Sequence, residues 1–358
     1  MRPTRPLNLI RLSALLLAAG VGLASPAVAA TPQQKTPAKS TSTSTARTTR
    51  KPTYSAAASS ARKARLERAR AASLVREQSR LRAVQALQVA MTPRFKTDAS
   101  GALVPDVRAA AAIIFNPENG KVLWQENAQD KRSIASITKV MTTVVFLEDN
   151  PDLSQEVTVE RSDVFAASTT YLKANDRITL DNLLHLTLIA SDNAAARALA
   201  RLSHGGTASF VERMNEKALE LGLESTSFVD PSGLNPDNVS SAYDLSRLIS
   251  FAASDDRISP IMRTADYQVS TTRRTFPIHS TNRLVRGGDV EVMGGKTGFI
   301  SKAGYCLATL LRLPATNHNI AVVVLGATSN NGRFWETRHL FNWLAEKADV
   351  FTKEDSQQ

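Results

Sequence analysis

The chain has 358 residues and carries 44 Lys or Arg against 33 Asp or Glu, a formal net charge of +11. Its single cysteine excludes an intramolecular disulfide and a thiolate metal site. The charge is uneven, because residues 1–100 hold eighteen basic and three acidic residues, whereas residues 101–358 sum to −4. An isoelectric point near 9.9 would suggest a nucleic-acid partner, but the mildly acidic remainder and the export signal described next argue against one.

The first thirty residues have the features of a secretory signal peptide. Three arginines and no acid precede an apolar run at residues 14–23, and a small-residue site predicts cleavage after Ala29. The alternative is an uncleaved membrane anchor, because residues 12–30 are nearly long enough to span a bilayer. Cys306 lies far from the leader and leaves no cysteine there for lipid attachment. We therefore expect secretion across the inner membrane and a periplasmic protein, soluble or peripherally attached.

Residues 30–103 form a basic tail of low complexity. Up to about Ser60 the tail consists mostly of Thr, Ser, Ala, Pro, Lys and Gln with almost no large apolar residue. It cannot bury enough apolar surface to offset its ordering entropy, so we expect disorder. From Ala61 to Met91 the composition shifts to Ala, Arg, Leu and Gln, which predicts a basic helix. Two alternatives remain open for this helix: a solvated, partly helical spacer, or a segment that binds an anionic envelope polymer or membrane surface.

The globular part is predicted for residues 104–351, followed by a short tail at residues 352–358. Apolar stretches at residues 110–115 and 121–124 flank a polar turn and predict a β-hairpin. Helices are predicted in the middle of the chain, at residues 136–148, 183–189, 194–202, 207–221 and 243–253. Thr179 is placed to cap the second of these helices.

Strand patterns return late in the chain. Strands are predicted at residues 290–293, 298–300, 305–313 and 320–325. A last helix is predicted after them, at residues 334–348. We therefore predict an α/β (α+β) unit in which an antiparallel sheet from both chain ends packs against an inserted, mostly helical lobe.

Three short motifs point to an acylating serine: Ser136-Ile137-Thr138-Lys139, Ser191-Asp192-Asn193 and Lys296-Thr297-Gly298. A Ser-x-x-Lys alone occurs by chance about once in a chain of this composition, whereas the ordered trio is specific. A serine hydroxyl needs an adjacent base, and positions three apart on a helix share a face. We therefore expect Ser136 and Lys139 to point into one cavity. Lys139 can act as the base if burial, or a neighbouring cation such as Lys296, lowers its pKa.

The second and third motifs supply groups for the substrate. Ser191 can relay a proton to a leaving amine, and the Asn193 amide can hold a substrate carbonyl. The alternative for this motif is a helix N-cap, which Ser191, Asp192 or Asn193 could each provide. Lys296 offers a positive charge to a substrate carboxylate, Thr297 offers a hydroxyl, and Gly298 lets another backbone approach closely. A turn with a surface lysine is the alternative for this third motif. The five histidines show no paired spacing, so we expect neither a metal nor a cofactor.

Together the motifs resemble the low-molecular-mass penicillin-binding proteins, serine D-alanyl-D-alanine peptidases that act on peptidoglycan. The resemblance covers residues 104–350 and extends to Lys302-Ala303-Gly304-Tyr305 and to Gly332-Arg333 before the last helix. It implies a serine β-lactamase/DD-peptidase-like fold, a covalent reaction with β-lactams and no metal.

The resemblance also assigns roles to single residues. It implies that Ser136 is acylated, that Lys139 is its base, and that the backbone N–H groups of Ser136 and Phe299 form the oxyanion hole. Relatives often carry a polar residue at the position of Phe299. The remaining positions implied to act on substrate are Ser191, Asn193, Lys296, Thr297, Gly298 and Arg333, of which Arg333 stands where the family has an arginine for a substrate carboxylate.

The subtype expected from the resemblance is a D,D-endopeptidase that cuts stem-peptide cross-links during cell wall remodelling. Carboxypeptidases of the family usually continue into a β-rich domain and an amphipathic anchor, whereas this sequence ends at Gln358 after one helix. A D-alanyl-D-alanine carboxypeptidase that trims pentapeptides is the alternative. A class A β-lactamase is less expected, because its deacylating Glu-x-x-Leu-Asn loop is matched only by residues 230–235, with a shorter acid and an extra residue. A catalytically silent envelope-binding protein is the last alternative, although every motif residue is retained.

Overall fold

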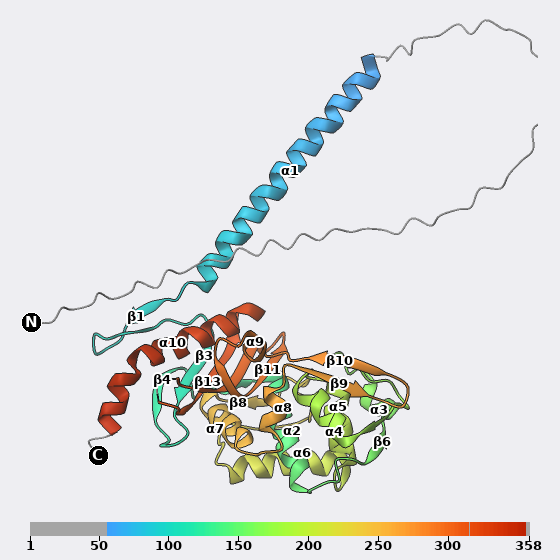
Figure 1. Cartoon of the computed structure of the whole chain (residues 1–358), viewed down its shortest axis with the longest axis vertical. Helices are drawn as coiled ribbons and strands as arrows, with labels where there is room; N and C mark the ends of the chain where they lie inside the picture. The colour runs from blue at the N-terminus through green and yellow to red at the C-terminus, as the bar shows by residue number, and fades with distance from the viewer. Residues whose placement is uncertain (1–55, 315, 356–358) are drawn as a thin grey trace, which may run out of the picture. The chain divides into compact units, whose positions relative to one another are not determined.

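The computed structural model of the chain describes residues 56–314 and 316–355 (Figure 1). The predicted signal peptide, residues 30–55 of the segment predicted to be disordered and residues 356–358 of the predicted C-terminal tail lie outside the described residues. The chain divides into two compact units, residues 1–70 and 71–358. The second unit contains all three motifs.

A five-stranded antiparallel sheet joins the two ends of this second unit. Its order is β11-β12-β13-β3-β4, so that β3, an early strand, lies beside β13, a late one. The predicted hairpin is formed by β3 and β4, and the strands predicted at residues 290–293 and 298–300 are parts of a single strand, β11. The bounds are β3 Ala111–Phe115, β4 Val122–Glu126, β11 Glu291–Ile300, β12 Gly304–Arg312 and β13 Asn319–Ala327. The α/β prediction is confirmed.

Helices cover both faces of the sheet. Helix α10 (Asn330–Asp355) packs on one face and α7 (Ala242–Ala253) on the other (Figure 1). Because successive side chains of a strand point to opposite faces, each strand contributes to both layers. Ile114 packs with Phe341 in the core under α10, whereas its neighbour Ile113 belongs to the larger core shared with α7. Both Ile side chains are fully buried.

The inserted helical lobe follows β4 in the chain. Its main helices are α2 Thr138–Glu148, α4 Leu180–Leu188, α5 Asn193–Leu202 and α6 Gly206–Glu220. Helix α2 is buried from its first residue almost to its last, which makes it the central helix of the lobe. The Thr179 side chain caps α4 by accepting from the Asn182 N–H, as its sequence position predicts.

Short elements that the sequence analysis did not predict complete this unit. They are too short to show a periodicity. These elements are β5 Arg132–Ser133, β6 Glu156–Thr158, α3 Arg161–Val164, β7 Arg177–Thr179, β8 Val239–Ser240, α8 Ser259–Arg263, β9 Asp266–Ser270, β10 Thr275–His279 and α9 Arg283–Gly287.

The predicted basic helix is α1, Ala56–Met91, which begins five residues earlier than Ala61 because the alanines ahead of that position favour helix. Its described side chains from 59 to 89 are all exposed. Regular structure then resumes before the predicted start at Val104, in the paired strands β1 (Phe95–Thr97) and β2 (Leu103–Pro105). Among the described residues, no helix has both the length and the apolar character needed to cross a membrane.

Candidate active site

The first motif lies on a tight turn at the entrance to α2. Ser136 is in the short 3₁₀ helix η1, Ala135–Ile137, and Lys139 is in the first turn of α2. The turn is strained, because Ala135 has a φ of 49°, in the left-handed region. The Lys139 Nζ atom lies 3.0 Å from the Ser136 Oγ atom. The two side chains therefore meet, although Ser136 precedes the α-helix proper.

The surroundings of Lys139 determine what its amine can do. The side chain is fully buried, and its Nζ donates to the Asn193 Oδ1 atom at 2.6 Å and to the Ser232 carbonyl at 2.5 Å. Burial lowers the pKa of Lys139 to about 7, against the opposing influence of Asp192 and Asp230. Because these two acceptors take two N–H groups, the lone pair of the neutral amine faces the Ser136 hydroxyl. A neutral lysine in this geometry can accept the serine proton.

The second motif connects α4 to α5. The capping residue of α5 is Asp192, whose side chain accepts from the Ala195 N–H. Capping by Asp192 leaves Ser191, with a φ of 60°, and Asn193 to face the cavity. Asp192 is fully buried and also accepts from the Tyr171 N–H at 2.6 Å. The sequence left this capping role open among Ser191, Asp192 and Asn193, and in the structure Asp192 fills it.

The third motif lies on β11 and contacts the second. The Lys296 Nζ donates to the Ser191 Oγ atom at 2.8 Å and to the Thr297 carbonyl at 2.9 Å. Burial lowers the pKa of Lys296 well below its usual value, and the positive charge of Lys139 lowers it further. The Thr297 hydroxyl donates to the Thr281 hydroxyl at 2.7 Å. Both lysines therefore lie beneath one site, separated by the serines that they contact.

Two glycines allow other segments to press against the Ser136 turn. A Cβ atom at Gly298 would lie 2.5 Å from the Ile134 carbonyl oxygen. At Gly233, which has a φ of 80°, it would lie 2.0 Å from the Ala135 carbonyl oxygen. Only a residue without a side chain permits these distances. Strand β11 and the loop at residues 230–235 thus fix the turn from two sides.

The loop at residues 230–235 contributes backbone atoms rather than a carboxylate. The Asp230 carboxylate accepts from the N–H groups of Ser232, Gly233 and Asn235 within its own turn. Its oxygens are therefore occupied by the loop itself. The Ser232 carbonyl, which contacts Lys139, is a functional group that the sequence analysis missed. Gly233 was its only sequence signal.

A cavity of about 540 Å³ opens above these groups. It is lined by Ser136, Ser191, Asn193, Thr297, Gly298, Phe299 and Arg333 among others. The structure therefore brings together every predicted site residue, with Lys139 and Lys296 buried beneath the cavity. Phe299 is 49% exposed and stacks on Tyr305, with ring centroids 4.3 Å apart.

Arg333 differs from its expected arrangement. Only 6% of the residue is exposed, and its Nη1 donates to the carbonyl oxygens of Gly298 at 2.9 Å and Cys306 at 3.2 Å. Its Nη2 donates to the Asn330 Oδ1 atom at 2.6 Å. The guanidinium therefore binds protein acceptors, although its residue reaches the cavity wall. Within the described part of the chain, no three His, Cys, Asp or Glu side chains gather as metal ligands would.

An activated serine beside a buried lysine, with a neighbouring Ser/Asn pair and a lysine-bearing edge strand, defines the class of the protein as a serine acyl-transfer hydrolase. The comparisons with known proteins agree. The sequence profile of a family described as D-alanyl-D-alanine carboxypeptidase matches residues 98–329. The chain belongs to this family of serine D-alanyl-D-alanine peptidases, to which the penicillin-binding resemblance pointed.

Individual relatives support the same assignment. A D-alanyl-D-alanine endopeptidase of Escherichia coli is 32% identical over 250 residues, which cover 69% of this chain and 80% of that protein. A D-alanyl-D-alanine endopeptidase of Haemophilus influenzae is 34% identical over 224 residues, 62% of this chain and 77% of that protein. A crystal structure of the Streptomyces K15 DD-transpeptidase has a TM-score of 0.62 at 28% identity and covers 67% of this chain and 97% of that one.

Proposed function

We propose that this peptidase is an endopeptidase that cleaves D-alanyl cross-links between peptidoglycan stem peptides through an acyl-enzyme on Ser136. The observation that carries the proposal is the contact between the Lys139 amine and the Ser136 hydroxyl, with the other N–H groups of the amine held by Asn193 and Ser232. Lys139 takes the hydroxyl proton as the Ser136 Oγ atom bonds to the D-alanyl carbonyl carbon.

The remaining steps use the other two motifs. The N–H groups of Ser136 and Phe299 stabilise the oxyanion of the tetrahedral intermediate. The C–N bond then breaks, and Ser191, which contacts Lys296, relays to the leaving amine the proton that Lys139 took from Ser136. Water subsequently hydrolyses the Ser136 ester and regenerates the hydroxyl. Asn193 holds the acyl-donor peptide, while Lys296 and Thr297 supply the cationic and hydroxyl groups for a carboxylate on the acceptor side.

The endopeptidase assignment is supported by two relatives that carry this name, and the region matched to this chain covers more than three quarters of each of them. The D-alanyl-D-alanine carboxypeptidase that trims pentapeptides remains the second candidate, favoured by the description of the family.

Two muropeptides separate these activities. The purified enzyme is given a cross-linked dimer and a monomeric pentapeptide at equal concentration, and both products are quantified. We expect the higher kcat/KM on the dimer. Release of D-alanine from the pentapeptide without cleavage of the dimer would establish the carboxypeptidase instead.

β-Lactams should trap the enzyme as a stable ester on Ser136. The proposal rests on the Asp230 carboxylate, which is held by its own loop and is not available to position a hydrolytic water. A labelled penicillin followed by peptide mapping should locate the label on Ser136. Rapid turnover of the penicillin would instead favour a β-lactamase.

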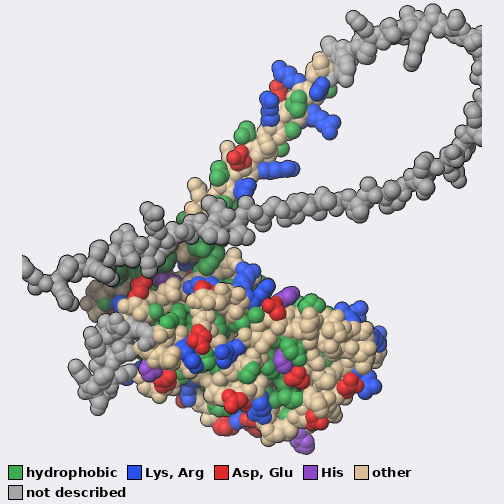
Figure 2. All heavy atoms as spheres, in the orientation of Figure 1, with side chains coloured by type: hydrophobic (Ala, Val, Ile, Leu, Met, Phe, Trp, Pro, Cys, Tyr) green, Lys and Arg blue, Asp and Glu red, His purple; other side chains and the backbone are tan. Residues whose placement is uncertain are grey.

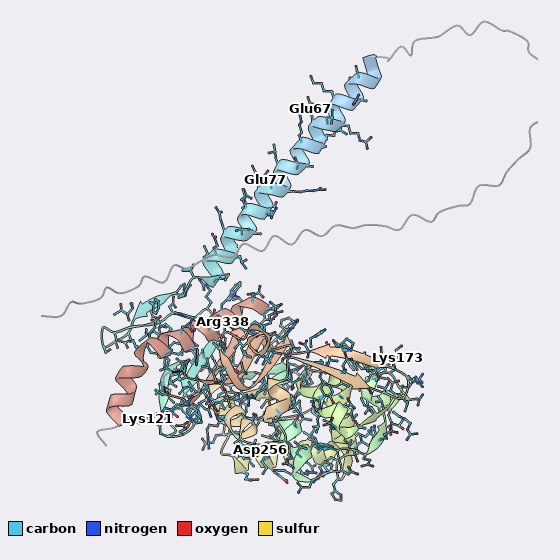
Figure 3. The ribbon with its side chains drawn as sticks, in the orientation of Figure 1. Glu67, Glu77, Lys121, Lys173, Asp256 and Arg338 are labelled. Carbon is cyan, nitrogen blue, oxygen red and sulfur yellow. The ribbon has the colours of Figure 1, made fainter. Side chains whose placement is uncertain are left out.

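Export and wall association are the cellular part of the proposal. Residues 1–29 would direct secretion into the periplasm. Helix α1 would then bind an anionic envelope polymer, because it carries eight Lys or Arg against Glu67 and Glu77 (labelled in Figure 3) and exposes its described side chains to solvent. Fractionation and N-terminal sequencing of the expressed protein test the export step: a mature end at Ala30 in the periplasm supports it, and an intact cytoplasmic chain contradicts it.

A further inference from the structure

The buried Arg333 contacts the peptide group whose N–H is expected in the oxyanion hole. The Gly298 carbonyl and the Phe299 N–H belong to one planar peptide unit. In a trans peptide these two groups point in opposite directions. Whatever fixes the Gly298 oxygen therefore fixes the direction of the Phe299 N–H. The Arg333 Nη1 atom donates to this oxygen at 2.9 Å.

The hydrogen bonds of β11 show which way this N–H faces. The carbonyls of an extended strand alternate in direction. The Thr297 carbonyl accepts from the Lys296 Nζ, which also contacts Ser191, a residue of the cavity wall. The next carbonyl, that of Gly298, faces Arg333. The Phe299 N–H opposes the Gly298 carbonyl and so shares the direction of the Thr297 carbonyl, toward the cavity.

This peptide is held by the sheet on one side, where Gly298 pairs with Cys306 of β12, and receives a further contact from Arg333 outside the sheet. β11 is an edge strand of the sheet, and Gly298 has no side chain to restrict its backbone. Gly298 must nevertheless remain a glycine because of the Ile134 carbonyl beside it. A hydrogen bond from another element can supply the restraint that a side chain at this position cannot.

Arg333 is itself held by contacts to a side-chain amide and two aromatic rings. The Arg333 Nη2 atom donates to the Asn330 side chain. The guanidinium of Arg333 also lies over the rings of Phe334 and Tyr305, 5.0 and 5.6 Å from their centroids. Burial lowers the pKa of Arg333 to about 10, so that it stays positively charged at neutral pH. A cationic donor on the Gly298 carbonyl also polarises the peptide, which strengthens the Phe299 N–H as a donor.

We propose that Arg333 is a positioning residue for the oxyanion hole, which it orients and polarises through the Gly298 carbonyl. The role differs from binding a substrate carboxylate directly. It rests on the acyl-enzyme at Ser136 proposed above.

A pair of substrates distinguishes the two roles. The full-length enzyme is given a D-alanyl thioester that ends in a free carboxylate and a counterpart in which that carboxylate is amidated, and thiol release is followed in a single turnover. In Arg333→Gln we expect acylation to fall by the same factor with both, about ten- to a hundredfold, somewhat less than the loss of a whole oxyanion donor. A loss confined to the carboxylate-bearing thioester would overturn the proposal.

A vibrational measurement reports on the hole itself. The carbonyl stretch of the acyl-enzyme, observed by isotope-edited infrared difference spectroscopy, should shift upward in Arg333→Gln, because a weakened N–H donor polarises the carbonyl less. An unchanged frequency would contradict the proposal. Arg338→Gln is the matched control, since Arg338 lies on the same helix, pairs with Asp289 at the surface and is labelled in Figure 3. It should leave the frequency and both acylation rates unchanged.

Folding and acylation of the starting enzyme are checked in the same series. If Arg333→Gln fails to fold, Asn330→Ala removes the partner of Nη2 while keeping the cation. We expect Asn330→Ala to produce a smaller loss in the same direction with both thioesters, and equal rates to the parent enzyme would count against the proposal. If the parent enzyme itself forms no ester on Ser136, the proposed function fails, and this inference fails with it.

Discussion

Two groups of positive charge in this protein show how burial determines what a cation does. Lys139 and Lys296 are almost completely enclosed, and burial lowers the pKa of both. The basic side chains described on α1 stand in solvent along its length (Figure 2). Lys139, whose pKa burial lowers to about 7, can exchange a proton near neutral pH, whereas the basic side chains of α1 stay in contact with water.

The two groups also differ in how their charges act: the buried lysines through single close contacts, and the basic residues of α1 through their total charge. Each buried lysine is surrounded by named acceptors at 2.5–3.0 Å, so a single lost contact changes the chemistry of the site. The charges of α1 act on a partner through their sum and are screened by salt. Removing one buried lysine should therefore have a much larger effect than removing one arginine of α1.

Removal of the buried base is expected to have the largest effect. Lys139→Ala should slow acylation by a labelled penicillin at least about a hundredfold, the usual scale for loss of a general base. Ser136→Ala should abolish labelling altogether. Both rates are measured by stopped reaction and gel fluorography, with thermal unfolding to verify the fold. An unchanged rate in Lys139→Ala would remove Lys139 from this role.

A glycine substitution tests whether the backbone packed against the Ser136 turn is needed for acylation. Gly233→Ala should reduce acylation by roughly tenfold to a hundredfold, because its Cβ would displace the Ala135 carbonyl next to Ser136. Gly120→Ala is the matched control: Gly120 also has a positive φ, 73°, but no atom lies within 4 Å of an added Cβ. Gly120→Ala should lose about 1–2 kcal/mol of folding free energy to the same backbone strain, and its acylation rate should equal that of the parent enzyme. Equal rates in the two variants would show that the turn tolerates displacement.

The pH dependence of acylation tests the state of the buried lysine directly. Lys139 must be neutral to accept a proton, and its pKa is lowered to about 7. The rate should therefore rise about tenfold per pH unit below 7 and level off above it. A rate that continued to climb toward pH 10 would show that the amine titrates as an ordinary exposed lysine. Rates are measured with the labelled penicillin from about pH 5 to about pH 10.

Neutralising exposed charge should have the smallest effect on the enzyme itself. Changing Arg76, Arg80 and Arg82 of α1 to Gln should leave kcat/KM on small thioesters and the free energy of unfolding within about 0.5 kcal/mol of the parent. It should weaken retention on isolated cell-wall sacculi, most clearly at low salt. Equal retention would contradict polymer binding by α1. Loss of binding to anionic vesicles, with retention on sacculi unchanged, would identify a membrane surface as the partner.

Much of the site follows from local sequence. Ser136 and Lys139 share a turn because of their spacing, and Thr179 caps α4 because a hydroxyl precedes an apolar helix. Most long helices and the main strands are periodic enough to be predicted within a few residues. Helix α10 is the exception, because it runs to Asp355, beyond its predicted end at residue 348 and into the predicted tail. The hairpin of β9 and β10 and the early strands β1 and β2 were missed, because short pairs owe their structure to neighbours far away in the chain.

By itself, the sequence determined the order of the motifs, the meeting of the serine and the lysine at the start of a helix, and the sheet drawn from both chain ends. Only the tertiary structure decided the chemistry of each group, because burial and hydrogen-bond partners come from residues far apart in sequence. Ser232 reaches Lys139 across 93 positions, and Arg333 reaches Gly298 across 35. No local pattern encodes such contacts, yet they set the pKa of a base and the direction of a backbone N–H.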